Sequence, residues 1–295
     1  MSVSTLLARS VDRITTKQRL GPDAQVDDKA LIIVPTDPAL TDPFLMLAED
    51  WFSEPGFEWH PHRGLETVTT VLDGVLEHGD NLGNVGALEA GDVQWMTAGR
   101  GIIHRELAFR NEHVHTLQLW LNLPARLKMT ATAYQDVLAA DRTKVQLPGA
   151  IVDVVSGAAF GATGPAVNHQ PVQGAMVTLE PGAVLDYVLP ASHRAFVHVL
   201  AGHVRVAGKA LQAGQTAWSD PARKVGESRL PLEAADRDDR VELMVYSGEP
   251  IREPVAFGGP FVMNQRSEIE QAFADFRAGK FGQVPRQQRL KRRRA

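Results

Sequence analysis

Two pairs of side chains that can bind a metal ion stand out in the sequence. His60 and His62 lie two residues apart, and His104 and Glu106 repeat that spacing 42 residues after His62. Both pairs lie in sequence that otherwise has a β pattern. Alternate residues of a strand project from the same face, with Cα atoms about 6.6 Å apart. Two such pairs on facing strands would therefore direct three imidazoles and one carboxylate at a single point.

This set of donors suits a divalent transition metal. Borderline metals favour imidazole nitrogen together with carboxylate oxygen, and four protein ligands leave open positions on an octahedral ion. An isolated His-x-His is more often accidental or a surface pair. Here glycine-rich turns frame both pairs within alternating β sequence, which favours a metal site.

The composition excludes several classes of protein. The chain has 295 residues, of which 44% are hydrophobic and 22% charged, with a net charge of -4. These values are typical of a soluble globular protein and give no general reason to expect nucleic acid as a partner. The absence of cysteine excludes disulfides, zinc–thiolate sites, iron–sulfur clusters and thiol catalysis. Residues 1–20 lack the apolar core of a signal peptide, and no segment has the length of a membrane helix, so we expect a cytoplasmic protein.

The elements that must position the two pairs are short strands. Residues 66–72 are β-branched and roughly alternating, Asp73-Gly74 suits a type I′ turn, and residues 75–78 continue as the return strand. Further turns are predicted at residues 81–84 and 89–92. Strands at this spacing favour a sandwich or a barrel.

The second half of the chain repeats the first. Residues 71–74 match residues 199–202 at an offset of 128, and residues 87–91 match residues 210–214 at an offset of 123. Two matched segments in the same order indicate duplication. The five-residue difference predicts a shorter hairpin in the second copy. We therefore predict two β-barrels that meet near residues 144–148.

The second copy lacks the four metal-binding side chains. The corresponding positions hold Val188, Pro190, Glu227 and Arg229. One metal site per chain is therefore predicted, in the N-terminal barrel.

The C-terminal region has a helical pattern and then a basic run. Residues 267–270 (Ser-Glu-Ile-Glu) form a capping-box pattern, followed by an apolar stripe of Ile269, Phe273 and Phe276, and Gly279 is a plausible stop. Six arginines and lysines fall within residues 286–294. Such a run can bind nucleic acid or acidic lipid, but a solvated tail is the favoured interpretation.

Several segments resemble the pirin family of the cupin superfamily. They are Asp-Pro-Phe-Leu-Met-Leu at 42–47, His-Pro-His-Arg-Gly at 60–64, Glu-Thr-Val-Thr at 66–69, Gly-Asp-Val-Gln-Trp-Met-Thr-Ala-Gly-Arg-Gly at 91–101 with His104, Gln-Leu-Trp-Leu-Asn-Leu-Pro at 118–124, Tyr-Gln-Asp at 134–136, and residues 249–264. The resemblance runs from about residue 30 to residue 282. Thr70 departs from it, where the family usually has an aromatic residue, and so does Arg105, where a small residue commonly separates the last two ligands.

The resemblance implies an all-β fold of two cupin (jelly-roll) β-barrels in tandem, with a short C-terminal helix. The expected division is residues 1–145 for the N-terminal barrel with the metal site, 146–264 for a C-terminal barrel without metal ligands, and 265–295 for the helix and basic tail. The family's single metal, usually assigned as iron, would be held by three histidines and one glutamate. Carried over position by position, these ligands are His60, His62, His104 and Glu106.

Glu66, His113 and His115 also have side chains that can bind a metal. Glu66 falls where many cupins place a glutamate ligand, but in pirin-like chains Glu106 has that role, so Glu66 is expected beside the ligands and not among them. His113 and His115 form another His-x-His and are expected to be structural or surface residues. Arg105 should point to the opposite face of its strand from His104 and Glu106.

The family resemblance implies two functions. The first is a quercetin 2,3-dioxygenase-like enzyme that acts on a flavonol-type aromatic substrate and O2, with Glu106 as both ligand and general base. The expected cofactor is one divalent ion, Fe(II) first, with Mn, Ni, Co, Cu or Zn behind it. The alternative is a non-catalytic iron-binding regulatory protein that contacts a transcription factor or a metabolic enzyme. The sequence does not distinguish them, because both functions need the same ligands. We expect no membrane partner, and no nucleic-acid partner except at the basic tail.

Overall fold

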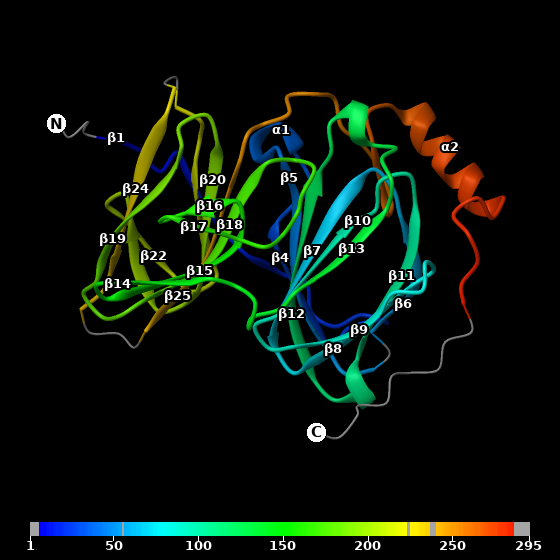
Figure 1. The fold of residues 1–295 in the computed structure, drawn as a ribbon, viewed down its shortest axis with the longest axis horizontal. Helices are drawn as coiled ribbons and strands as arrows, with labels where there is room; N and C mark the ends of the chain where they lie inside the picture. Colours follow the sequence, from blue (N-terminus) through cyan, green and yellow to red (C-terminus); the bar gives the residue numbers. More distant parts are fainter. Residues whose placement is uncertain (1–5, 55, 223–224, 237–239, 286–295) are drawn as a thin grey trace. The chain divides into compact units, whose positions relative to one another are not determined.

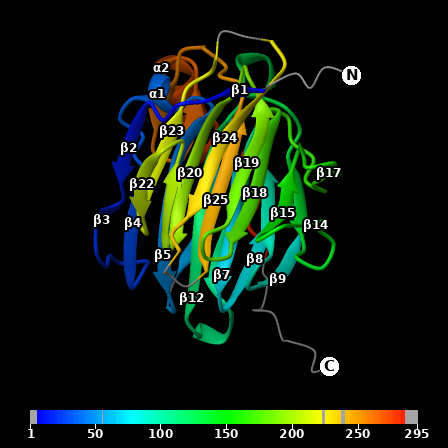
Figure 2. The same cartoon turned by 90° about the vertical axis from the view of Figure 1, so that its left-hand side faces the viewer.

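The fold is almost entirely β, as the sequence predicts (Figures 1 and 2). The computed structural model describes residues 6–54, 56–222, 225–236 and 240–285. They form two compact units. The first, here called the N-terminal barrel, comprises residues 18–140 and the described residues from 251 onward; the second, the C-terminal barrel, comprises residues 6–17 and 141–250.

The N-terminal barrel consists of two antiparallel sheets that enclose an apolar core. One sheet has the order β13 (Ala133–Val137), β10 (Val93–Thr97), β7 (Leu65–Asp73), β12 (Val114–Asn122), β5 (Phe44–Phe52), β4 (Asp28–Ile33) and β3 (Gln18–Arg19). The other has the order β6 (Phe57–His62), β11 (Ile102–Ala108), β8 (Val75–Asp80) and β9 (Val85–Glu89). Phe52, Val71 and Val114 of the first sheet meet Leu76 and Leu88 of the second in one buried cluster. The core therefore lies between the sheets.

Shorter elements complete this unit. They are α1 (Pro38–Thr41), the 3-10 turns η1 (Phe109–Asn111) and η2 (Ala125–Leu127), the ribbon β26 (Ala256–Gly258) and β27 (Phe261–Met263), and α2 (Arg266–Arg277).

The prediction of a type I′ hairpin at Asp73-Gly74 is wrong. β7 pairs with β10 and β12, whereas β8 pairs with β9 and β11, so the chain passes from one sheet to the other at Gly74. Gly74 has a φ of +78°, and a Cβ there would lie 2.2 Å from the carbonyl oxygen of His113. A type I′ turn and this crossing both require glycine, and the sequence does not separate them.

The C-terminal barrel also has two sheets. One has the order β14 (Lys144–Leu147), β15 (Ala150–Ser156), β18 (Val172–Leu179), β25 (Val241–Gly248), β20 (Arg194–Ala201), β23 (Gln215–Ser219) and β2 (Arg13–Thr16). The other contains β1 (Leu7–Ala8), β24 (Glu227–Ala234), β21 (His203–Val206) and β22 (Lys209–Gln212), with β19 (Val184–Pro190) also paired to β24. A two-stranded ribbon, β16 (Ala158–Ala159) and β17 (Ala162–Thr163), lies outside them.

The predicted shorter hairpin of the second copy is confirmed. The β8–β9 hairpin spans residues 75–89, whereas the β21–β22 hairpin spans residues 203–212. The strands that follow each carry a buried tryptophan, Trp95 in β10 and Trp218 in β23. The sequence repeat therefore corresponds to the same connection in each barrel.

Both barrels take strands or segments from the other end of the chain. β2 pairs with β23 and β1 pairs with β24, so residues 6–17 belong to the C-terminal barrel. Residues 251–285 return to the N-terminal barrel. The expected division at residues 145 and 264 stays a prediction, but the compact units differ from it at both ends because strand pairing reassigns these segments.

Helix α2 begins slightly earlier than its sequence pattern predicts. The N-cap is Gln265, and the Glu268 carboxylate accepts the backbone N–H groups of Asn264 and Gln265, so the capping box is not at residues 267–270. The stop at Gly279 is confirmed by its position after the C-cap and its φ of +72°. Ile269, Phe273 and Phe276 pack together as expected.

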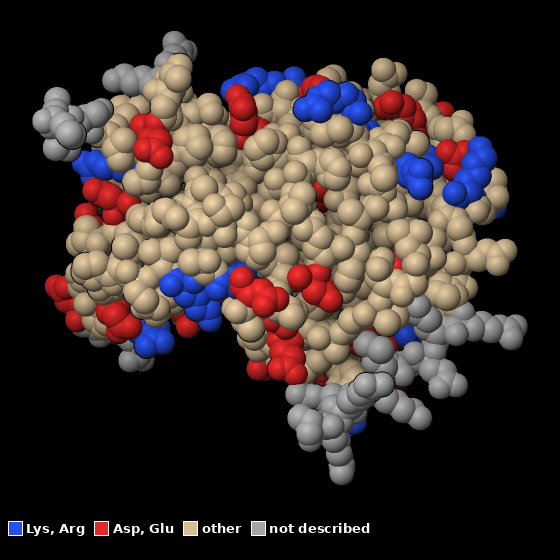
Figure 3. Space-filling view, viewed as in Figure 1, with Lys and Arg blue, Asp and Glu red and all other residues tan. Residues whose placement is uncertain are grey.

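On the face in Figure 3, lysine and arginine are interspersed with aspartate and glutamate among the described residues. Neither of the helices in that part of the chain is long and apolar enough to cross a membrane. The basic run at residues 286–294 lies outside the described residues.

Candidate metal centre

Strand pairing brings the two predicted pairs together. β11 lies between β6 and β8, with His104 directly opposite His60 on β6 and Glu106 directly opposite His78 on β8. Directly opposite residues of an antiparallel pair share one face. His62 follows His60 at the same two-residue spacing. The inner face of this sheet therefore carries a row of histidines with one carboxylate.

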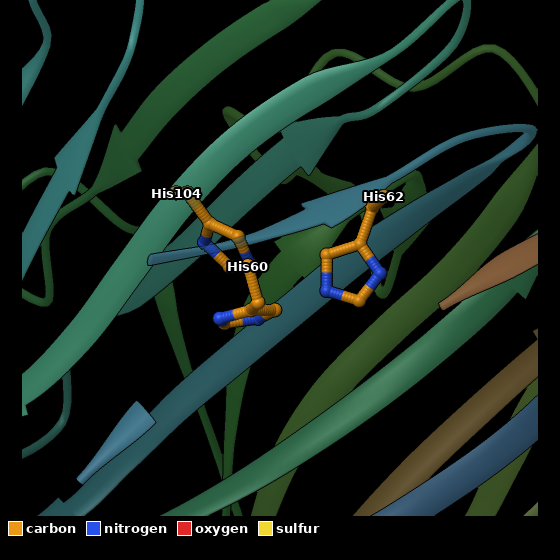
Figure 4. A group of neighbouring side chains, drawn as sticks. All are labelled: His60, His62 and His104. Atoms are coloured by element: carbon orange, nitrogen blue, oxygen red, sulfur yellow. The ribbon is translucent and has the colours of Figure 1, made fainter. Parts of the chain in front are cut away.

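The three predicted histidines form a compact group. The ring centroids are 4.3 Å apart for His60 and His104, and 5.0 Å apart both for His60 and His62 and for His62 and His104. One nitrogen from each ring lies within 4.8 Å of one nitrogen of the other two. Figure 4 shows His60 and His62 extending from β6 toward His104 on β11. Three imidazoles at this spacing can bind one ion.

The hydrogen bonds of two rings leave the opposite nitrogen free. His60 Nδ1 lies 2.8 Å from the carbonyl oxygen of Glu58, and His62 Nδ1 lies 3.2 Å from that of Pro260. A carbonyl only accepts, so each Nδ1 is the protonated nitrogen and each Nε2 has a lone pair. Within the described residues, His62 Nε2 and both nitrogens of His104 are buried without a hydrogen-bond partner. Buried polar atoms of this kind usually have a partner, such as an ordered water or a bound ion.

Burial keeps these imidazoles neutral. It lowers the pKa of His60, lowers the pKa of His62 to about 3, and holds the pKa of His104 well below its usual value. The neighbouring rings add to the effect on the pKa of His62 and His104, because a second positive charge would repel the first. A neutral imidazole is the form that binds metal.

Glu106 is held from the opposite sheet. Its Oε1 accepts the hydroxyl of Thr69 at 2.8 Å, and its Oε2 accepts the amide of Gln118 at 2.6 Å. Thr69 on β7 and Gln118 on β12 are directly paired. Trp120 donates its indole N–H to Gln118 Oε1 at 3.0 Å, which orients the amide nitrogen toward Glu106. Burial raises the pKa of Glu106 to about 7, although these two hydrogen bonds lower it.

Glu106 lies beside His78, a neighbour that the sequence analysis does not predict. His78, His104 and Glu106 form a second group in which one ligand atom of each residue lies within 4.8 Å of the others. The group of His60, His62 and His104 does not include the Glu106 carboxylate at that separation. His104 is thus shared by two candidate groups.

Two family models match the chain. The Pirin model covers residues 32–121, and the model of the Pirin C-terminal cupin domain covers residues 174–282. The chain belongs to the pirin family. Pirin-1 of Arabidopsis thaliana is 38% identical over 282 residues, which are 92% of this chain and 96% of that protein.

Other relatives of this pirin-family chain are named as quercetin dioxygenases. A putative quercetin 2,3-dioxygenase of Pseudomonas aeruginosa is 42% identical over 233 residues, covering 77% of this chain and 79% of that protein. The crystal structure of a quercetin 2,3-dioxygenase from Acinetobacter baumannii has a TM-score of 0.82 and 31% identity, and covers 93% of this chain and 99% of the other. These likenesses confirm the bicupin fold.

The donor set fits a metal ion, as the family resemblance implies. The fit rests on the buried, unpartnered nitrogens of His62 and His104 and on the neighbouring Glu106 carboxylate. Both candidate groups found among the described residues lie within residues 60–106. At the second-copy positions, Arg229 of β24 instead pairs with Asp186 at 2.7 Å.

The other candidate residues lie apart from the group, which for Glu66 differs from the expected position beside the ligands. Glu66 accepts the hydroxyl of Thr97 at 2.8 Å. Because Glu66 and Thr69 are three residues apart on β7, Glu66 points to the face of the strand opposite Thr69. His115 stacks on Trp51 with ring centroids 4.4 Å apart and contacts Glu49 at 3.1 Å, while His113 is exposed. Arg105 pairs with Glu77 at 3.0 Å, on the face away from Glu106 as expected.

Sequence reasoning missed His78, Thr69 and Gln118. His78 lies 2.7 Å from Gln94 through its Nδ1, and its ring centroid is 5.3 Å from that of His104. The available signal was the His78-Gly79-Asp80 segment, which has the same two-residue spacing as His104 and Glu106. Asp80 instead accepts the backbone N–H groups of Leu82 and Asn84. The approach of His78 to Glu106 depends on the β8–β11 pairing, which the local sequence does not specify.

Proposed function

We propose that this pirin-family chain is a metal-dependent dioxygenase that cleaves flavonol-type aromatic substrates with O2. His60, His62, His104 and Glu106 would hold one divalent ion. The observation that supports this most is the group of three neutral imidazoles beside a buried carboxyl whose pKa is about 7. The names of two relatives, in Pseudomonas aeruginosa and Acinetobacter baumannii, point to the same reaction.

Fe(II) is the metal that we propose first for this site. A bound redox-active ion would supply Lewis acidity that lowers the pKa of a substrate hydroxyl, and open positions for substrate and O2. Nitrogen and oxygen sites bind copper and nickel more tightly than iron, so the ion that occupies the site depends on availability. Zinc or nickel in a preparation would therefore not contradict the proposal.

Glu106 is proposed as the general base. Burial raises the pKa of Glu106 to about 7 in the metal-free protein, so this carboxyl takes up a proton more readily than an exposed glutamate. The hydrogen bonds from Thr69 and Gln118 fix the direction of both carboxylate oxygens. Glu106 would accept the proton of the flavonol 3-hydroxyl, which a positioned carboxylate can do only within hydrogen-bond reach.

Trp120 is proposed to contact the flat substrate. Its ring lies edge-on to His62, with centroids 5.1 Å apart, and its indole N–H is already bonded to Gln118. The indole packs in part against Leu45, Leu65 and Val262, and its remaining apolar surface would meet an aromatic ring. The side chain would therefore orient substrate beside the metal ligands without adding charge.

The test is flavonol turnover by protein of known metal content. The full chain, purified without added metal, would be analysed for metals, loaded anaerobically with Fe(II), and mixed with quercetin and O2. We expect one O2 consumed and one CO released for each quercetin cleaved, by the unchanged protein and by His115→Ala, but not by His60→Ala. No CO from the iron-loaded protein would overturn the proposal.

A further inference from the structure

Each of the three histidines has a chain neighbour that packs against one distant segment. Trp59 and Ile103 pack with Phe261, Ile269 and Phe273 in a single cluster. Arg63, which follows His62, lies over the ring of Phe281 at 4.4 Å. All these partners belong to residues 256–281, here called the C-terminal segment, which lie in the same compact unit as the histidines. In Figure 1 this segment includes the orange helix α2, on the side of the N-terminal barrel that carries β6 and β11.

The C-terminal segment also bonds directly to a predicted ligand. The carbonyl of Pro260 accepts Nδ1–H of His62 at 3.2 Å. Next to it, the backbone N–H of Val262 donates to the carbonyl of Arg63 at 3.0 Å. The buried amine of Lys128 donates to the carbonyls of Gly64 and Val262 at 2.8 and 2.9 Å. The turn that follows His62 is thereby joined to the segment at three points.

A buried ion pair between Arg63 and Asp275 also fixes the turn that follows His62. Arg63 donates to Asp275 of α2 at 2.9 Å and to the carbonyl of Arg100 at 2.7 Å. The two side chains of the pair are 6% and 12% exposed, so water screens them little. Gln271 and Lys280 also donate to Asp275, each at 2.8 Å. Asp275 is therefore held rigidly in the position that receives Arg63.

We propose that the C-terminal segment is a positioning element of the metal site. It holds His62 as the Nδ1–H tautomer, so that Nε2 carries the lone pair for the ion, and the Arg63–Asp275 pair keeps the turn in register with the Pro260 carbonyl. This inference rests on the proposed metal site. Partners of this kind, one step removed from the ion, set the tautomer and orientation of a ligand histidine, and their loss typically weakens metal affinity by about 10- to 100-fold.

A matched pair of variants tests this in the full-length protein. Asp275→Asn removes the charge that receives Arg63. Asp153→Asn does the same to the buried Arg142–Asp153 pair of the C-terminal barrel, whose side chains are 2% and 14% exposed. Both variants lose a buried ion pair, so a general loss of stability should affect both. Asp275→Glu keeps the charge and serves as the conservative variant.

Two measurements separate positioning from folding. The first is Co(II) affinity together with the visible absorption spectrum of the Co(II)-loaded protein. We expect Asp275→Asn to bind Co(II) about 10- to 100-fold more weakly with a shifted spectrum, Asp153→Asn to match the unchanged protein, and Asp275→Glu to recover most of the affinity. The second is the 15N NMR signature of the His62 tautomer in the metal-free protein, where Asp275→Asn should lose the pure Nδ1–H form.

Equal Co(II) affinity and an unchanged His62 tautomer in a folded Asp275→Asn protein would overturn the inference, and so would equal losses in Asp275→Asn and Asp153→Asn. Neither measurement depends on flavonol cleavage. If the unchanged protein binds Co(II) but cleaves no flavonol, the dioxygenase proposal fails while the positioning role stands.

Discussion

Burial has opposite effects on Glu106 and on the histidines beside it, because it disfavours the charged form of each. The carboxyl tends to keep its proton, whereas the imidazoles tend to lose theirs. Burial raises the pKa of the carboxyl to about 7 and lowers the pKa of His62 to about 3. The metal-free centre therefore holds neutral imidazoles beside a carboxyl that keeps its proton to a higher pH than an exposed glutamate does. Divalent metal binding requires that this carboxyl be ionised, so metal and proton compete for it.

The first prediction concerns the stability of the metal-free protein. The pKa of Glu106 rises from 4.5 to about 7 on folding. The contribution of this proton to the free energy of unfolding is fully present below pH 4.5 and is lost as the pH rises through 7. Because Glu106→Gln cannot titrate, its free energy of unfolding relative to the unchanged protein should rise by up to about 3 kcal/mol across this window. Urea unfolding at both ends would measure it, and a pH-independent difference would contradict the assigned shift.

The second prediction distinguishes the two groups that share His104. We expect His60→Ala to lose the metal, and His78→Ala to keep it with an affinity about 10-fold lower, because His78 contacts a ligand and is not one. His115→Ala, which lies outside both groups, is the control. Metal titration of the three stripped proteins decides it. Retention by His60→Ala together with loss by His78→Ala would place the ion in the group of His78, His104 and Glu106.

At the scale of strands, β11 is the element on which the centre depends. All its residues are buried, and alternate side chains face opposite ways. His104 and Glu106 face the barrel interior, whereas Ile103 packs against α2. The register shifts between His104 and Glu106, so Glu106 lies opposite Phe57 on β6. This irregularity accompanies the separation of Glu106 from the group of His60, His62 and His104.

The third prediction tests the turn that ends β6. Gly64 has a φ of +80°, and a Cβ there would lie 2.0 Å from the carbonyl oxygen of Val262. Gly161 has a φ of +78° with nothing within 4 Å of its Cβ position. We expect Gly161→Ala to cost about 1–2 kcal/mol for the backbone conformation alone, and Gly64→Ala to cost more than about 3 kcal/mol. Thermal unfolding of both variants measures this, and equal costs would contradict it.

The sequence predicted these elements unevenly, for physical reasons. The His60–His62 and His104–Glu106 spacings are local, and strand geometry converts them directly into one face. The hydrogen bonds of Glu106 to Thr69 and Gln118 cross between sheets, and the His62–Pro260 bond joins residues 198 positions apart. Such contacts depend on the closed barrel. The hairpin predicted at Asp73-Gly74 was wrong because a glycine with positive φ suits both a type I′ turn and a crossing between two sheets.

At the scale of the molecule, the two barrels differ in that the candidate metal-binding groups found among the described residues lie in the N-terminal barrel. The core of the C-terminal barrel includes one large cluster of aliphatic residues with Tyr187. In this barrel, the four positions that match the metal ligands in the sequence repeat lie on the paired strands β19 and β24, with Val188 opposite Arg229 and Pro190 opposite Glu227. Duplication therefore supplied the fold twice, while the candidate metal ligands among the described residues lie in one copy.

The fourth prediction is the stoichiometry that follows from this asymmetry. Stripped protein reloaded with Fe(II) or Mn(II) should bind one ion per chain, and His104→Ala should bind none. His198→Ala is a suitable control, since His198 is a buried C-terminal-barrel histidine that contacts Thr216 at 2.8 Å. Elemental analysis after gel filtration gives the ratio. Two tightly bound ions per chain, or an ion lost with His198, would place metal in the second barrel as well.

The central claim is that Glu106 moves a proton during metal-dependent flavonol cleavage, and Glu106→Gln tests it most directly. The amide keeps an oxygen donor and the side-chain size but cannot take the proton. The measurement is CO release from quercetin, expressed per bound iron, for this variant and the unchanged protein. The account predicts a loss of about 10²-fold or more per metal, the lower end of what a positioned base contributes. A Glu106→Gln protein with full iron content and undiminished CO release would contradict it.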